Sequence, residues 1–136
     1  MIPKFRVWFP DFNQMLRVKA LVFEKDKTRC ACGHSFDFYL EYENATIMQS
    51  TGLKDKNCNE IFEGDIITNG PDVMCMKRHN TLGFYVEQKG KIEFIADCAV
   101  LEEFEEDAKE IADSLEIIGN IYENPELLEV NHDTIR

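Results

Sequence analysis

Alternation of apolar and polar side chains along most of the chain restricts its fold more than any other feature. Phe5, Val7 and Phe9 share one face of the first alternating stretch, and the same period returns over residues 15–23. A period of two residues is typical of β-strands that bury one face. We therefore predict a β-hairpin over residues 4–23.

Further alternating or apolar runs predict more strands downstream. Gly64 interrupts one of these runs, which indicates a β-bulge or a close approach of two backbones. The polar hexapeptide Lys54–Asn59 predicts an exposed turn, and the charged connector within residues 24–34 predicts a loop. The strands are expected at residues 36–42, 45–49, 61–67, 82–88, 91–96 and 116–122.

One amphipathic helix is predicted over residues 101–115, because the apolar period there changes to steps of three and four residues. The whole pattern predicts an α+β, mainly β fold, with an N-terminal β-hairpin region, a small bent antiparallel barrel and this helix. We expect a single domain over residues 1–136 with sub-regions 1–50 and 51–130, and a seam in the loop at 24–34. The helical stripe contains Leu101, Phe104, Ala108, Ile111 and Leu115.

Charge argues against a protein that clamps phosphates. The chain has 26 Asp and Glu against 15 Lys and Arg, a formal net charge of −11. Residues 1–60 sum to +1 and residues 61–136 to −12. Because nucleic-acid binding depends on Lys and Arg that neutralise the backbone, no direct nucleic-acid binding is expected. Without a spanning apolar run or a secretory signal, we expect a cytoplasmic protein that does not bind membranes.

The five cysteines are expected to be reduced and mostly structural, since their number is odd and no export signal is present. Cys30, Cys32 and His34 bring zinc-type ligands together, but their spacing is poor for structural zinc. Because no glycine-rich phosphate loop or catalytic motif occurs, we predict no metal, no cofactor and no enzymatic activity, and a metal-dependent enzyme is the least favoured alternative. The ligands that could complete a tetrahedral site are Cys58, or Cys75 with His79.

Three stretches in order resemble the YopX family of uncharacterised phage and prophage proteins: residues 4–8, residues 48–57 running into 60–66, and residues 116–128. The resemblance implies a β-rich fold with an SH3-like barrel in the second half, allows for a homo-oligomer, and carries no known activity. The chain departs from the family at Phe9, where an aspartate is usual, and at Cys58, where a glycine is usual. The second departure implies a turn that depends less on positive φ, or one that bears strain.

The leading hypothesis is a non-enzymatic β-barrel module that binds an unidentified protein partner and associates with itself. Its candidate contact residues are the polar residues of the resembling stretches, although Asn120 has the alternative role of satisfying turn backbones. Glu63 and Asp65 could serve as paired carboxylates, but a bulge followed by an Asp-capped turn explains them more simply. The candidates are Lys54, Asp55, Asn57, Glu63, Asp65, Asn120 and Tyr122.

The alternative hypothesis uses the acidic face of the helix at residues 101–115. Regularly spaced carboxylates can imitate a phosphate backbone and occupy a nucleic-acid-binding protein by charge complementarity. Such a decoy would bind in a salt-sensitive way. Its residues would be Glu102, Glu103, Glu106 and Glu110.

Overall fold

The strands form three antiparallel sheets in the computed structural model, which describes residues 4–33, 36–79, 83–88, 91–96 and 111–128. The chain divides into two compact units, Met1–Ser50 and Thr51–Arg136. Strand β6 (Thr46–Lys54) runs across this boundary in the sequence. Each unit has its own hydrophobic core, so each is described by itself.

In the first unit, β1 (Phe5–Phe9) and β2 (Gln14–Val18) form an antiparallel hairpin with Val7 opposite Leu16. The other edge of β1 pairs with the first half of β6. The predicted hairpin is therefore confirmed as far as Val18. Beyond this residue the chain leaves the sheet, because β3 (Ala20–Phe23) pairs with a different strand.

That partner strand, β4 (Thr28–Ala31), lies inside the segment that the sequence predicts to be a loop. It is the central strand of a three-stranded sheet with the order β3-β4-β5, where β5 is Asp37–Tyr39 and the 3-10 helix η1 (Leu40–Tyr42) follows. Cys30 in this strand is fully buried. The predicted loop is therefore wrong at residues 28–31 and is observed at 24–27 and 32–33. The strand was missed because one buried thiol gives no visible alternation. The two units divide at residues 50 and 51 rather than at the predicted seam.

The hydrophobic core of the first unit contains side chains from the sheet of β1 and from the sheet of β4. Val7 and Cys30 are 0% exposed and pack in one cluster with Phe9 and Phe38. Half-buried side chains complete the cluster, and burying each large apolar side chain contributes on the order of 1.5–3 kcal/mol. These side chains are Leu16, Val18, Leu21, Cys32, Leu40 and Ala45.

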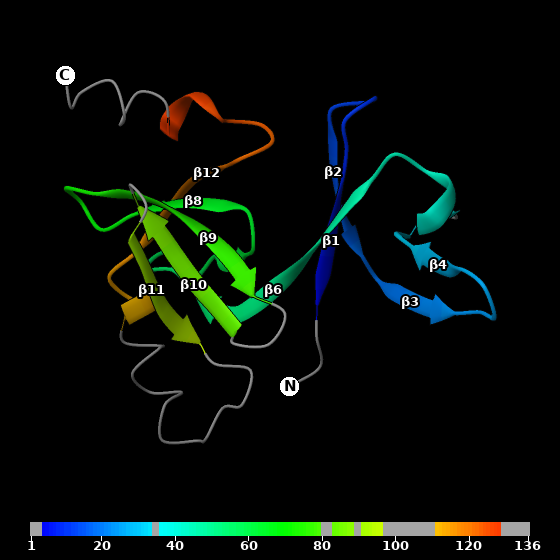
Figure 1. Cartoon of the computed structure of the whole chain (residues 1–136), viewed down its shortest axis with the longest axis horizontal. Coiled ribbons are helices and arrows are strands. Elements are labelled where there is room, and N and C mark those ends of the chain that lie inside the picture. Colours follow the sequence, from blue (N-terminus) through cyan, green and yellow to red (C-terminus); the bar gives the residue numbers. More distant parts are fainter. Residues whose placement is uncertain (1–3, 34–35, 80–82, 89–90, 97–110, 129–136) are drawn as a thin grey trace. The chain divides into compact units, whose positions relative to one another are not determined.

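The second unit is built on a five-stranded sheet with the order β11-β10-β9-β8-β12, which curls into a half-barrel (Figure 1). All neighbouring strands in it are antiparallel. Strand β7 (Glu60–Phe62) belongs instead to the sheet of β6. The five strands are β8 (Asp65–Thr68), β9 (Val73–His79), β10 (Gly83–Gln88), β11 (Lys91–Ala96) and β12 (Glu116–Asn120).

Strand β9 is central in this sheet, yet no strand is expected there from the sequence. Met74, Cys75 and Met76 are consecutive and all buried, so the segment shows no alternation of apolar and polar residues. The hairpin of β10 and β11 and the strand β12 are confirmed. The structure thus supports a mainly β fold with the curled sheet in its second unit.

Ala112 and Leu115 cover the core of the second unit, at the end of the segment predicted to be helical. The helical part of this segment that the structure describes is residues 111–112, and residues 101–110 lie outside the described part. Ile111 is 38% exposed, so its predicted place in the buried stripe is wrong. A second short helical segment occupies residues 126–128. Within the described residues, no helix has the length and apolarity needed to cross a membrane.

We expect Met76→Ala to destabilise the protein by about 2–5 kcal/mol, because it removes a fully buried side chain from the middle of the sheet. The neighbouring Lys77→Ala should cost no more than about 1 kcal/mol, since the Lys77–Glu87 pair is partly exposed. Urea unfolding of both variants measures the difference. Equal losses would show that the core of the second unit does not depend on β9.

Candidate functional site

Asp55 lies in the polar turn at residues 54–59, called the Asp55 turn below, and it is only 2% exposed. Its Oδ1 accepts hydrogen bonds from the backbone N–H groups of Asn57 and Asn59, both at 2.9 Å. Its Oδ2 accepts one from the backbone N–H of Ile117 at 3.0 Å. The turn is confirmed, but its key carboxylate points inward and binds a strand 62 residues away.

Burial is the largest single influence on this carboxyl and raises its pKa, but the three N–H donors outweigh it. The net result is that the pKa of Asp55 lies below its ordinary value. Asp55 is therefore ionised at neutral pH. A carboxylate held in this way is a poor proton donor or acceptor, because its protonation breaks the bonds that bury it.

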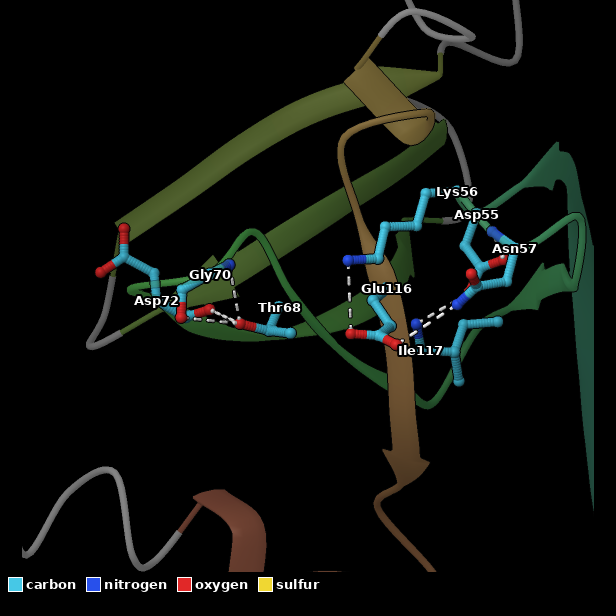
Figure 2. Close-up of polar contacts among 8 residues, drawn as sticks. All are labelled: Asp55, Lys56, Asn57, Thr68, Gly70, Asp72, Glu116 and Ile117. Carbon is cyan, nitrogen blue, oxygen red and sulfur yellow. Dashed lines mark hydrogen bonds and ion pairs between the residues drawn. The ribbon is translucent and has the colours of Figure 1, made fainter.

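The Asp55 turn lies along the edge of β12 that does not face β8. The backbone N–H of Lys56 donates to the carbonyl of Leu115 at 2.9 Å. Figure 2 shows Lys56 and Asn57 both reaching the Glu116 carboxylate, with Lys56 Nζ 3.6 Å from Oε1 and Asn57 Nδ2 3.3 Å from Oε2. These two contacts are exposed and add little stability compared with the buried one.

The turn at residues 69–72 follows β8, the strand that pairs with the other edge of β12. Glu116 is opposite Thr68 in this pairing, so the turn begins next to the start of β12. The Thr68 hydroxyl donates to the carbonyl of Asp72 at 2.7 Å and accepts from the Gly70 N–H at 3.1 Å (Figure 2). Asn69 Oδ1 accepts from the Asp72 N–H at 3.0 Å. Strand β8 ends immediately before this turn.

Gly64 brings two other segments together through its backbone. Its N–H donates to the carbonyl of Met76 at 2.7 Å, and its carbonyl accepts from the Ile121 N–H at 2.9 Å. With φ at +90° and buried between these neighbours, the position suits glycine alone. Of the two sequence interpretations, the close backbone approach is the one observed.

Asp65 follows directly and is 2% exposed. Its Oδ2 accepts a hydrogen bond from the Phe62 N–H at 2.7 Å, so the predicted Asp-capped turn is present. Asn120 is its partner in the β8–β12 register. Both residues therefore lie where the end of β12 meets the Gly64 turn.

Asn120 uses its side chain to close the chain reversal after β12. Its Oδ1 accepts from the N–H groups of Tyr122 and Glu123 at 3.0 and 2.9 Å, and its Nδ2 donates to Glu123 Oε1 at 2.9 Å. Asn124 Oδ1 in turn accepts from the Asn120 N–H at 3.2 Å. A Cβ on Gly119 would stand 2.6 Å from that oxygen, which explains the glycine.

The predicted contact residues therefore form two separate clusters rather than one site. Asp55 and Asn57 meet at the start of β12, while Asp65, Asn120 and Tyr122 meet at its end. Glu63 is half-buried beside Arg78, with Oε1 3.4 Å from Nε. Lys54 is exposed at the end of β6. Three of the seven, Asp55, Asp65 and Asn120, bind backbone N–H groups through their side chains. Lys54 and Asn57 are the exposed ones.

The described residues offer little support for a metal site or for a reactive thiol. Among the described residues, no group of three or more His, Cys, Asp or Glu side chains could hold a metal ion. His34 lies outside these residues, as do Glu102, Glu103, Glu106 and Glu110 of the acidic segment. Burial raises the pKa of Cys30 and of Cys75 to about 11, so both are protonated thiols near neutral pH.

Sequence reasoning missed an apolar groove in the first unit, called the aromatic groove below, with a volume of about 640 Å³. Phe9 at its base stacks edge-to-face on Phe38 with centroids 4.8 Å apart, and Phe36 lies 6.0 Å from Phe9. The signal that could have found it is Phe12, a large aromatic side chain in a predicted turn. The groove is lined by Phe9, Phe12, Gln14, Leu16, Cys32 and Phe36.

Comparison with known proteins gives a family and a fold. The family profile described as YopX protein matches residues 4–129. The crystal structure of protein EF1440 from Enterococcus faecalis is similar, with a TM-score of 0.60 and 27% sequence identity over 94% of this chain and 99% of that chain. No curated protein matches the sequence.

We expect Asp55→Asn to destabilise the protein by about 2–3 kcal/mol, because an amide supplies one acceptor oxygen and turns its NH₂ group toward backbone donors. Asp72→Asn is the matched control, since the described contacts of Asp72 use its backbone only. Chemical unfolding at pH 7 compares the two. A loss in Asp55→Asn no larger than in the control would contradict the role of the carboxylate.

The Asp55 carboxylate also predicts that the stability of the protein depends on pH. The folded pKa of Asp55 lies below the ordinary value of about 4, so its stabilisation is present above pH 4 and is lost as pH falls through the folded pKa. The stability gap between wild type and Asp55→Asn should therefore be constant at higher pH and narrow below about pH 4. A gap that does not change on acidification would refute this.

Cys58 adopts φ +65° in the Asp55 turn, so the departure from the family glycine bears strain. Cys58→Gly should raise stability by about 0.5–1 kcal/mol, because the relief of left-handed strain exceeds the added chain entropy. Cys58→Ala keeps the Cβ and should show no gain. If alanine stabilises as much as glycine, the thiol rather than the backbone is responsible.

Proposed function

Because the chain belongs to the YopX family, we propose that it is a phage-encoded, non-enzymatic module that binds other proteins and associates with itself in the host cytoplasm. The proposal rests on how the chain uses its polar residues and on where it exposes its aromatic ones. The family carries no activity that could be transferred. The argument therefore depends on the chain's own side chains.

The buried carboxylates favour a scaffold over an active site. Asp55 accepts three backbone N–H groups, and Asp65 accepts one at 2.7 Å. General acid–base catalysis needs a group that can exchange a proton near neutral pH within reach of a substrate. Asp55, with a lowered pKa and both carboxylate oxygens bound to backbone N–H groups, does not meet that need.

The observation that carries the proposal is the exposure of large aromatic side chains in the first unit. Phe23 is 80% exposed at the end of edge strand β3, and Tyr42 is 70% exposed at the end of η1. Tyr42 is held edge-to-face against Tyr39 at 5.6 Å, so it is presented in a defined orientation. Aromatic side chains are enriched in protein interfaces, where they bury large areas with few rotatable bonds.

Charge directs self-association to the same unit. Residues 1–50 have seven Lys and Arg against six Asp and Glu, whereas residues 51–136 have eight against twenty. Two copies meeting through their second units would repel each other, and this repulsion is absent between the near-neutral first units. We therefore place the self-contact at Phe23 and Tyr42.

The second unit would serve as the rigid scaffold, as an SH3-like barrel. Numbered from β8, its sheet has the strand order 5-1-2-3-4, with the last strand β12 returning to the first. This is the strand order of SH3-like barrels, and the curl of the sheet is compatible with closure (Figure 1). Such barrels present loops and edges to many kinds of partner, so the scaffold alone does not name one.

We expect the full chain to sediment as an oligomer whose dissociation constant rises at least about tenfold in the double variant Phe23→Ser/Tyr42→Ser. Sedimentation velocity over a concentration series measures this. Ile118→Ser, at a 37% exposed position of the second unit, is the control and should leave the constant unchanged. Phe23, Tyr42 and Ile118 are all exposed, so folding is not at risk.

Two outcomes would overturn the proposal. A monomer at all concentrations would remove self-association. Salt-labile capture of a nucleic-acid-binding protein that charge reversal at Glu102, Glu106 and Glu110 abolishes would instead favour the acidic decoy.

A further inference from the structure

We propose that the aromatic groove is a binding site for a small apolar carboxylate, with Lys19 as the charge partner of the ligand. The site lies wholly in the first unit. Neither Phe23 nor Tyr42 lines it, so the inference is independent of the proposed self-contact. Its support comes from the shape of the groove, the chemistry of its walls and the position of one cation.

The size and composition of the groove are those of a ligand site. Its volume of about 640 Å³ falls within the 300–1,000 Å³ usual for small-molecule pockets. The walls are almost entirely apolar, and the polar side chain of Gln14 is available to donate a hydrogen bond. A ligand with a ring or alkyl body would therefore bury most of its surface.

The aromatic rings form a fixed base and an open rim. Phe9 forms the base and is 4% exposed, and its edge-to-face contact with Phe38, which is 8% exposed and lies behind it, holds it in place. Phe12 and Phe36 are 69% and 47% exposed, with Phe12 centred 6.5 Å from Phe9. A preformed base of this kind lowers the ordering cost of binding, and the exposed rim rings gain contacts when a ligand enters.

Lys19 places a positive charge beside the groove. A Cβ on Gly33, which also lines the groove, would stand 2.9 Å from Lys19 Cε and 3.1 Å from Nζ. Gly33 has φ +89°, and its missing side chain leaves the space in which the lysine lies. Within the described residues, Lys19 forms no ion pair.

Two acidic residues are sequence neighbours of phenylalanines that line the groove, but neither of them lines it. Asp37, next to Phe36, accepts from Arg29 Nη1 at 3.0 Å, and Asp11, next to Phe12, accepts from Asn44 Nδ2 at 3.5 Å. Arg29 pairs with Asp37, whereas the neutral Asn44 leaves Asp11 charged. Lys19 is the charged side chain that lies against Gly33 of the groove wall. An apolar body with one negative group complements these walls and this cation together.

The backbone of the groove wall favours a small ligand over an extended peptide. The Cys32 N–H donates to the Phe36 carbonyl at 3.0 Å, and the Phe36 N–H donates to the Gly33 carbonyl at 2.9 Å. A peptide strand gains much of its affinity from main-chain hydrogen bonds, and these groups are already used. Recognition at the wall formed by Cys32, Gly33 and Phe36 therefore depends on side chains.

The test measures binding of 4-phenylbutyrate and of its neutral analogue 4-phenylbutanol to the full chain by titration calorimetry. The acid should bind one per chain and about threefold to fivefold more tightly than the alcohol. Lys19→Met, which keeps the alkyl chain, should remove this preference, and Phe12→Ala should weaken both ligands. Lys25→Met, at an exposed lysine that does not line the groove, is the matched control.

Cys32 gives a second readout, since it lines the groove and is partly exposed. Bound acid should slow its alkylation by iodoacetamide, read by peptide mass spectrometry, while exposed Cys58 should react unchanged. The proposal is overturned if neither ligand binds, if acid and alcohol bind equally, or if Lys25→Met acts like Lys19→Met.

Two other results would assign the groove to a different occupant and equally overturn the proposal. Protection of Cys32 that rises with protein concentration without ligand would mean that a second copy covers the groove. Tight binding of an acidic, phenylalanine-containing peptide without binding of 4-phenylbutyrate would mean a peptide site. If Phe23→Ser/Tyr42→Ser loses self-association but still binds 4-phenylbutyrate, the groove and the proposed self-contact are separate sites.

Discussion

The bond between the Asp55 carboxylate and the backbone of Ile117 is the contact on which the second unit depends. It joins two segments 62 residues apart and fixes where β12 begins. The far end of the same strand is fixed by Ile121, whose N–H binds the Gly64 carbonyl. With both ends held, β12 can complete the five-stranded sheet, and Leu115 just before it is set into the core.

This arrangement explains why the sequence stretches that mark the family lie far apart in the chain. Residues 48–66 form the Asp55 and Gly64 turns. Residues 116–128 form β12 and the reversal closed by Asn120, and backbone N–H groups of this segment bind both turns. From the sequence alone, Asp55, Asp65 and Asn120 are candidate contact residues for a protein partner. In the fold, their side chains bind backbone N–H groups, whose burial would otherwise cost about 1–3 kcal/mol each.

The sequence predicted the elements whose environment is local. Alternation identified the β1–β2 hairpin, the β10–β11 hairpin and β12, since each has one face that differs from the other. It missed β4, where one thiol is buried among charged residues, and β9, where three consecutive side chains are buried. Asp55 was expected to be exposed, because no residue near it in the sequence indicates that its carboxylate binds the N–H group of the distant Ile117. The aromatic groove was missed for the same reason, since Phe12 and Phe36 meet Phe9 only after folding.

The Asp55 turn has a consequence for how copies of this chain behave at high concentration. An outer strand with free N–H and C=O groups is a template on which further strands can stack, as in amyloid. On β12 the Ile117 N–H is already bound by a carboxylate, and the Leu115 carbonyl just before it by the Lys56 N–H. The side chains of Lys56 and Asn57 also lie over Glu116 and add bulk there. A turn of six residues thus keeps the last strand of the sheet from recruiting its counterpart in a neighbouring molecule.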